Sequence, residues 1–125
     1  MLFDSDVIIW GLRGLRRAQL IIDAAPHRFI SVVTYMEVCQ GLKNKEEALQ
    51  WKSFLSEINF KLLPIDEAIS NKAMYLMEEF CLSHGLTIPD AFIAATANVH
   101  GLPLITGNVK DYKFLPGLSI KSFKE

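Results

Sequence analysis

The chain has 125 residues, of which 50% are hydrophobic and 22% charged; this composition is typical of one folded domain over residues 1–125 and excludes a disordered chain. The net charge is −1, so there is no overall basic field for nucleic acid, and any polyanion must be held locally. Cys39 and Cys81 lack metal-ligand spacing, which predicts two reduced, partly buried thiols. No signal peptide or membrane span is recognisable, which predicts a cytoplasmic protein without membrane contact.

Five short segments have the length and composition of β-strands. Four are apolar runs, over residues 1–3, 29–33, 60–65 and 102–106, and a weaker, alternating segment covers residues 119–123. The four runs are too apolar for a strand with one face in water, so they favour a mainly parallel sheet covered on both faces.

Helical patterns lie between the later strands. Apolar residues recur at helical spacing over residues 45–58, and again between a possible N-cap at Asp66 and a stop at Gly85. PDAFIAATANVHG starts with Pro89 in a first helical turn and stops at Gly101; it is small or apolar on most sides, which predicts a buried helix. Strands alternating with helices predict an α/β fold, a three-layer sandwich with helices on both faces of the sheet.

Asp4, in LFDSDVIIW, directly follows the first predicted strand. A carboxylate between apolar segments is costly unless its charge is compensated. Because ligands of parallel sheets bind beyond the carboxyl ends of the strands, Asp4 is expected at that edge. Three more acids follow strands or begin helices: Glu37 in SVVTYMEV, Asp90 in LTIPDAF and Asp111 in TGNVKDY.

Each of these three acids also has a structural explanation. Each lies three residues after a residue that can cap a helix, namely Thr34, Thr87 and Asn108, which is the capping-box spacing. Helices that follow parallel strands begin at one edge of the sheet, however, so the four acids could converge there. Converging carboxylates take up protons or bind a cation, and oxygen ligands without His or Cys favour Mg²⁺ or Mn²⁺ over zinc.

The motifs LFDSDVIIW, SVVTYMEVCQGL, LTIPDAFIAATANVHGLPLITGNVKDY and PGL, in this order, resemble the PIN-domain ribonucleases. The resemblance is strongest to the VapC-type toxins of type II toxin–antitoxin systems. It covers nearly the whole chain, although residues 43–85 resemble the family only in pattern. The resemblance implies a PIN-like fold of the α/β class deduced above.

The resemblance also implies a metal site and its residues. The acids that would hold Mg²⁺ or Mn²⁺ are Asp4, Glu37, Asp90 and Asp111. Asp4 and Asp90 would be the most direct ligands. Thr106 and Asn108 match supporting positions, and Asp6 stands where the family often has Asn, so Asp6 either adds charge or orients the turn through backbone N–H groups.

The activity implied by the resemblance is metal-dependent endonucleolytic hydrolysis of RNA, with Glu37 or Asp111 as the possible proton acceptor and nearby Lys110 and Lys113 attracting the substrate. Toxins of this kind form homodimers and are inhibited by a cognate antitoxin. An apolar groove that could receive the antitoxin is expected around Trp10, Leu12, Trp51 and Phe54, at least half of which are expected to be core residues.

Two other interpretations fit parts of the sequence. FDSDV resembles the D-x-D motif of haloacid-dehalogenase-like phosphatases, in which the first Asp is the nucleophile, but the chain is short for that fold with its cap. A binding module without catalysis would use the acids only as helix caps.

Overall fold

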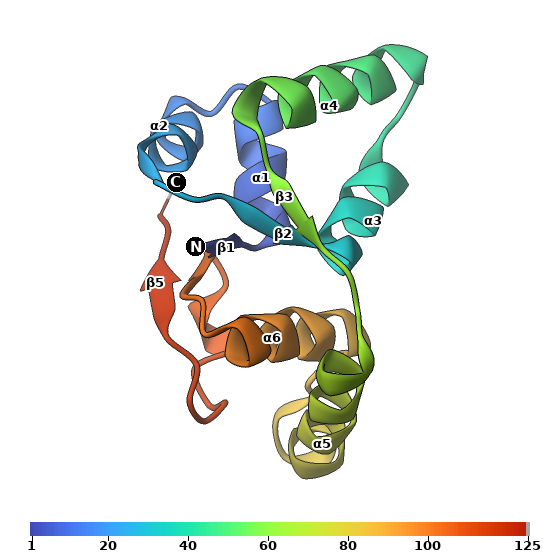
Figure 1. Ribbon diagram of the computed structural model, residues 1–125, viewed down its shortest axis with the longest axis vertical. Coiled ribbons are helices and arrows are strands. Elements are labelled where there is room, and N and C mark those ends of the chain that lie inside the picture. Colours follow the sequence, from blue (N-terminus) through green and yellow to red (C-terminus); the bar gives the residue numbers. More distant parts are fainter. Residues whose placement is uncertain (125) are drawn as a thin grey trace.

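A parallel sheet lies between two layers of helices in the computed structural model, which describes residues 1–124 (Figure 1). The five strands pair in the order β3-β2-β1-β4-β5, and every pairing is parallel. The strands are β1 (Leu2–Phe3), β2 (Phe29–Ser31), β3 (Lys61–Leu63), β4 (Leu104–Thr106) and β5 (Ile120–Ser122). The helices are α1 (Ser5–Leu12), α2 (Arg16–Ala24), α3 (Val32–Gly41), α4 (Lys45–Ile58), α5 (Glu67–His84) and α6 (Ile88–His100), and a 3₁₀ turn, η1, spans Val109–Asp111.

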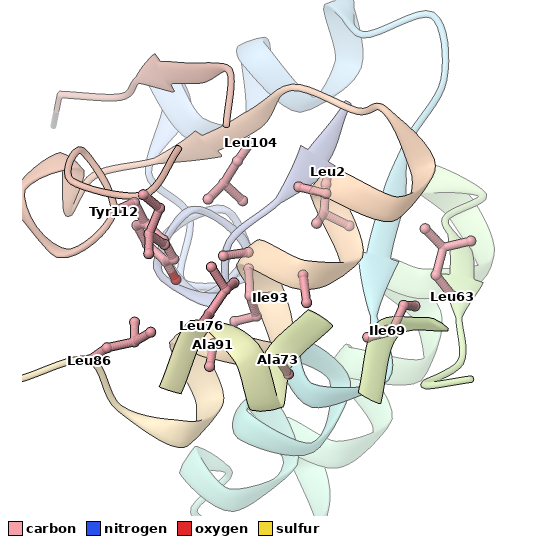
Figure 2. Close-up of a cluster of buried hydrophobic side chains, with 14 residues drawn as sticks. Leu2, Leu63, Ile69, Ala73, Leu76, Leu86, Ala91, Ile93, Leu104 and Tyr112 are labelled. Atoms are coloured by element: carbon pink, nitrogen blue, oxygen red, sulfur yellow. The ribbon is translucent and has the colours of Figure 1, made fainter. Parts of the chain in front are cut away.

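Successive side chains of the central strands alternate between two apolar layers, one on each face of the sheet. Leu2 and Leu104 belong to the buried cluster that contains α5 and α6, which Figure 2 shows in close-up. Phe3 and Ile105, the next residues along, belong to a second buried cluster with α1, α2 and α4 on the opposite face. Because successive side chains of a strand point to opposite faces, two-residue strands are enough to join both layers. The predicted three-layer sandwich around a parallel sheet is confirmed.

The boundaries of two helices, predicted from capping residues, are also confirmed. Asp66 caps α5 by accepting a hydrogen bond from the Ile69 N–H, and Gly85 ends the helix in the left-handed conformation. Thr87 caps α6, and Gly101 ends that helix in the same way as Gly85. The bounds of α4 agree with the predicted segment 45–58.

The structure corrects three details of the sequence interpretation. The second strand is shorter than the predicted residues 29–33, because Ser31 accepts a hydrogen bond from the Val33 N–H and begins α3 there. Helices α1 and α2 had no predicted bounds, since α1 is apolar on several sides and shows no single stripe. Cys39 is exposed rather than partly buried.

The strand pairing positions the predicted acidic edge. Leu2 and Phe3 pair with Leu104 and Ile105, so Asp4 and Thr106 are the next residues on two adjacent strands. Across residues 1–124, none of the helices has the length and apolar character needed to cross a membrane.

Candidate active site

Asp4 lies at the carboxyl end of the central strand and is 5% exposed. It also caps α1, where its Oδ1 accepts a hydrogen bond from the Ser5 N–H at 2.8 Å. Its Oδ2 accepts a hydrogen bond from the Thr106 hydroxyl at 2.7 Å. Burial raises the pKa of Asp4, and the hydrogen bonds from Thr106 and Ser5 only partly offset this effect.

Asp6, in the first turn of α1, binds the loop that follows β4. Its Oδ2 accepts hydrogen bonds from the Gly107 N–H at 2.9 Å and from the Asn108 side-chain amide at 3.1 Å. Its Oδ1 accepts the N–H of Val7. Asp6 therefore orients the turn, which was one of the two roles considered for it.

The pKa of Asp6 responds to its surroundings. Burial raises the pKa of Asp6 to about 6, and the neighbouring charge of Asp4 is the second cause. The hydrogen bonds show the orienting role, and a contribution of the Asp6 charge to the site stays a prediction.

Glu37 reaches the site from α3 through Ser5. The Ser5 hydroxyl donates a short hydrogen bond to Glu37 Oε1 and also lies 3.4 Å from Asp4 Oδ1. The predicted capping box from Thr34 to Glu37 is wrong: Ser31 is the N-cap, and Thr34 lies within the helix with a buried hydroxyl that has no partner. Glu37 therefore lies past the first turn, where its side chain can face the end of β1.

Asp90 lies in the first turn of α6, and the Thr87 hydroxyl accepts its N–H at 3.4 Å as expected for a cap. Its Oδ1 accepts a hydrogen bond from the Tyr112 hydroxyl at 3.0 Å. Burial raises the pKa of Asp90; the Tyr112 hydrogen bond opposes this, and the charges of Asp4 and Asp111 add to it. Asp90 is thus electrostatically coupled to two of the other predicted acids.

Asp111 is the last of the four predicted acids along the chain. It ends η1 and is half-buried, and its charge acts on Asp90. Asn108 precedes η1 but makes no side-chain cap bond, so the predicted capping box to Asp111 does not form. The Asn108 side chain bonds to Asp6 instead, which agrees with a supporting role.

The structure thus links all of the predicted site residues into one network at the carboxyl edge of the sheet. Asp4, Asp6 and Asp90 influence one another by charge, Ser5 connects Glu37 to Asp4, and Asp111 acts through Asp90. Within residues 1–124, no three His, Cys, Asp or Glu side chains are already arranged around a common metal position. The predicted acids are therefore linked in pairs rather than around one common point.

Two hydroxyl residues of this network were missed by the sequence interpretation. Ser5 lies between the two aspartates of the DSD motif, and Tyr112 directly follows Asp111 in KDY. A hydroxyl side chain next to a candidate acid in the sequence is the signal that could have pointed to both. Burial raises the pKa of Tyr112, with the charges of Asp4 and Asp90 as further causes, so the phenol keeps its proton and donates a hydrogen bond to Asp90.

The chemistry of the donors fits a hard divalent cation. The principal effects on the pKa values of Asp4, Asp6 and Asp90 are burial, mutual repulsion and neutral hydrogen-bond donors, and no Lys or Arg is among them. Clustered carboxylates without a compensating cation of the protein are suited to Mg²⁺ or Mn²⁺. Asp4, Asp90, Glu37 and Asp111 supply the available oxygen donors.

Comparison with protein families gives one match over most of the chain. The model of the PIN domain matches residues 1–114. Among curated proteins, ribonuclease VapC10 of Mycobacterium tuberculosis is 35% identical over 113 residues, which cover 87% of this chain and 83% of that protein. Ribonuclease VapC1 of Rickettsia felis is 26% identical over 96% of this chain and 93% of its own length.

Comparison with solved structures leads to relatives of the same kind. A chain of a toxin–antitoxin complex from Klebsiella pneumoniae superposes with a TM-score of 0.78 at 33% identity and covers 97% of this chain and 95% of its own length. A chain of the VapBC2 complex of Rickettsia felis, bound to a DNA fragment from its promoter, has a TM-score of 0.79 at 18% identity and covers 98% of both chains, which supports the fold.

Proposed function

The chain belongs to the PIN-domain family, with VapC-type relatives, and we propose that it is a metal-dependent endoribonuclease, the toxin of a toxin–antitoxin pair. The observation that carries this proposal is the group of uncompensated carboxylates at the end of β1. Asp4, Asp6 and Asp90 have raised pKa values, chiefly through burial, and lie close enough to repel one another. A protein gains from such an arrangement when a cation completes it.

In this proposal Asp4 and Asp90 hold Mg²⁺ or Mn²⁺ directly, with Glu37 and Asp111 beside them. Bound there, the ion would lower the pKa of a water molecule and stabilise the negative charge that develops on the phosphate. Thr106 and Ser5 fix the direction of the Asp4 carboxylate by their hydrogen bonds. Glu37 and Asp111 are the candidates for accepting a proton from the water.

The substrate would be attracted locally, because the net charge is near zero. Lys110 and Lys113 flank Asp111 and are both exposed, so they can meet phosphates beside the acidic edge. The names of the relatives, ribonucleases VapC10 and VapC1, support RNA as the polymer.

The antitoxin proposal is supported by a groove between α1, α3 and α4. Its lining combines apolar side chains with Arg13 and Glu47. Of the four residues expected at such a groove, Leu12 and Phe54 line this groove or its continuation along α4. Trp51 is 2% exposed and Trp10 packs on Phe123, so both serve the core. The known toxin–antitoxin complex from Klebsiella pneumoniae favours a partner of this class.

A homodimer is also part of the proposal. An apolar groove between α5 and α6 is lined by Met74, Met77, Ile88, Ala91 and Phe92, with Glu78 as its charged residue. Met74 and Ile88 are 61% and 62% exposed, which is costly for a monomer and suits a self-complementary contact with a second copy. A cytoplasmic location stays a prediction from the sequence.

The phosphatase alternative gains no support from the geometry. In a D-x-D phosphatase the second aspartate must exchange protons with substrate, whereas Asp6 is bound to Gly107 and Asn108. The binding-module alternative predicts neither RNA cleavage nor Mn²⁺ binding, whereas our proposal predicts cleavage in the presence of metal.

The decisive experiment is cleavage of a panel of structured RNAs, with and without Mg²⁺, followed by mapping of the ends. The wild-type protein should cut at defined positions only when metal is present. Asp4→Asn and Asp90→Asn should lose cleavage while the circular dichroism spectrum stays unchanged, because each removes a direct ligand but keeps the side-chain volume. Asp23→Asn, an exposed aspartate on α2, is the matched control and should cut normally.

Full cleavage by purified Asp4→Asn would contradict the proposed site. Turnover of a small phosphomonoester without RNA cleavage would favour the phosphatase, and the absence of both activities and of Mn²⁺ binding would favour a binding module. The product of a small open reading frame beside the gene, added to the assay, is expected to stop cleavage.

A further inference from the structure

Tyr112 combines a core position with a polar contact to the acidic network. The residue is 1% exposed, and its ring belongs to the same buried cluster as Leu104 and Leu76 (Figure 2). Its hydroxyl donates to Asp90 Oδ1 at 3.0 Å. A buried phenol needs a hydrogen-bond partner, and a backbone carbonyl would satisfy it equally well. Here the partner is an acid at the centre of the candidate active site.

The same hydroxyl also influences Asp4. Hydrogen bonding with Tyr112 is one of the effects that lower the pKa of Asp4, against the larger effect of burial, and both carboxylate charges act on the phenol. A phenol has one proton to donate, and the 3.0 Å geometry assigns it to Asp90. The hydroxyl therefore bonds to the carboxylate at the start of α6 and acts on the one at the end of β1, 86 residues earlier in the chain.

This arrangement matters because Asp4 and Asp90 repel each other. A neutral donor near both offsets part of that repulsion and fixes the direction of one carboxylate. The donor is held in place by its own backbone, since the Tyr112 N–H bonds to the Val109 carbonyl of η1 at 3.0 Å. The ring is locked in the core, so the hydroxyl position is set by packing.

We propose that Tyr112 is a positioning residue for the metal site, whose hydroxyl holds the Asp90 carboxylate toward Asp4 in the spacing that binds a divalent cation. This inference rests on the proposed function, because it takes Asp4 and Asp90 to be the direct ligands. It adds a residue to the site that core packing alone would not require, since phenylalanine would fill the same volume.

The test is Mn²⁺ binding by Tyr112→Phe, measured by calorimetry on metal-free protein at pH 7. The ring stays in the core and only the hydroxyl is lost, so we expect a folded protein whose Mn²⁺ affinity is about 10- to 100-fold weaker, as is typical when a residue that orients a ligand is removed. Tyr75→Phe removes a hydroxyl from the exposed face of α5 and should bind Mn²⁺ as wild type does.

The outcomes separate the inference from the function on which it rests. If the wild-type protein binds Mn²⁺, Asp4→Asn does not, and Tyr112→Phe stays within twofold of wild type, the metal site stands and the positioning role is wrong. If the wild-type protein binds no Mn²⁺, the proposed function itself fails. An equal loss in Tyr75→Phe would also overturn the role of Tyr112.

A second measurement needs no variant. The chain has three tyrosines, Tyr35, Tyr75 and Tyr112, so labelling with tyrosine that carries ¹³C at Cζ gives three NMR signals. Titration with Mg²⁺ should shift the Tyr112 signal, with the same midpoint as metal binding, and leave the Tyr75 signal in place. A Tyr112 signal that does not move while Mg²⁺ binds would overturn the inference.

Discussion

At the scale of single residues, the acids of this protein differ in what holds them. Asp4 is fixed by Thr106 and Ser5, Asp90 by Tyr112, and Asp6 by the backbone of Gly107. Each of these hydrogen bonds favours the charged carboxylate, yet burial outweighs them and leaves all three pKa values raised. The site is therefore held in shape by the protein while its charge is left for another group to neutralise.

The raised pKa of Asp6 makes the metal-free protein sensitive to pH. In the folded state this pKa is about 6, compared with an ordinary value of 3.8, so the folded state binds more protons than the unfolded state between these values. The contribution of Asp6 to the free energy of unfolding is therefore fully present below about pH 4 and is lost as the pH rises through about 6. Thermal unfolding in EDTA should show this decline, and saturating Mg²⁺ should reduce it.

Asp6→Asn is the variant that tests this account. Without a titrating group at position 6, the slope of stability against pH between 4 and 6 should be smaller than in the wild type. Asp23→Asn, which alters an exposed carboxylate on α2, should leave the slope unchanged. Equal slopes in wild type and Asp6→Asn would show that Asp6 is not the group responsible.

At the scale of elements, the loop after β4 fits closely against α1. A Cβ atom on Gly107 would lie 2.7 Å from the Trp10 ring and 2.8 Å from Asp6 Oδ2. Trp10 is itself packed on Phe123, with ring centroids 5.4 Å apart, so it has little room to move. The requirement for glycine at position 107 thus comes from close packing between the loop and the helix that carries Asp6.

Gly107→Ala is expected to destabilise the protein by roughly 1–3 kcal/mol, the usual cost of forcing a methyl group into a packed site. Gly41→Ala is the matched control, because a Cβ there meets nothing within 4 Å and should be tolerated. Urea denaturation of both variants measures the difference. Equal free energies of unfolding for the two variants would mean that the loop and Trp10 can move apart without loss of stability.

At the scale of the whole molecule, the parallel sheet gathers the site. Asp4 follows β1, Thr106 ends β4 and α3 begins after β2. These strands point the same way, so the three positions meet at one edge although they are distant in sequence. The helices α5 and α6 on one face leave an apolar groove, and α1, α3 and α4 on the other leave the mixed groove that we propose for the antitoxin. In our proposal, catalysis, inhibition and self-association therefore take place on different surfaces.

The proposed dimer predicts a twofold chain mass in light scattering. Met74→Lys should yield a monomer with an unchanged circular dichroism spectrum, because a buried lysine without a partner is unfavourable at an apolar contact. Leu82→Lys is the control on the same helix: Leu82 is 98% exposed and lies outside the groove lining, so this variant should stay dimeric. A monomeric wild-type protein would rule the dimer out.

The sequence alone determined the features that depend on local chemistry. Apolar runs and capping residues predicted the parallel α/β sandwich and the ends of α5 and α6, because these depend on short-range patterns. The sequence interpretation did not set the bounds of α1 and α2, and it placed the end of β2 too late, because the Ser31 cap begins α3 there. The four candidate acids were also found by their place after strands and at helix starts.

Only the tertiary structure decided how those acids are held. The contacts Asp4–Thr106, Asp6–Gly107 and Asp90–Tyr112 join residues separated by 102, 101 and 22 positions. Spacing along the chain carries no information about such pairs, since they depend on the register of β1 against β4 and on the path of the loop after it. The adjacency of Ser5 and Tyr112 to acids in the sequence could point to both residues, but the fold decided which acid each hydroxyl bonds.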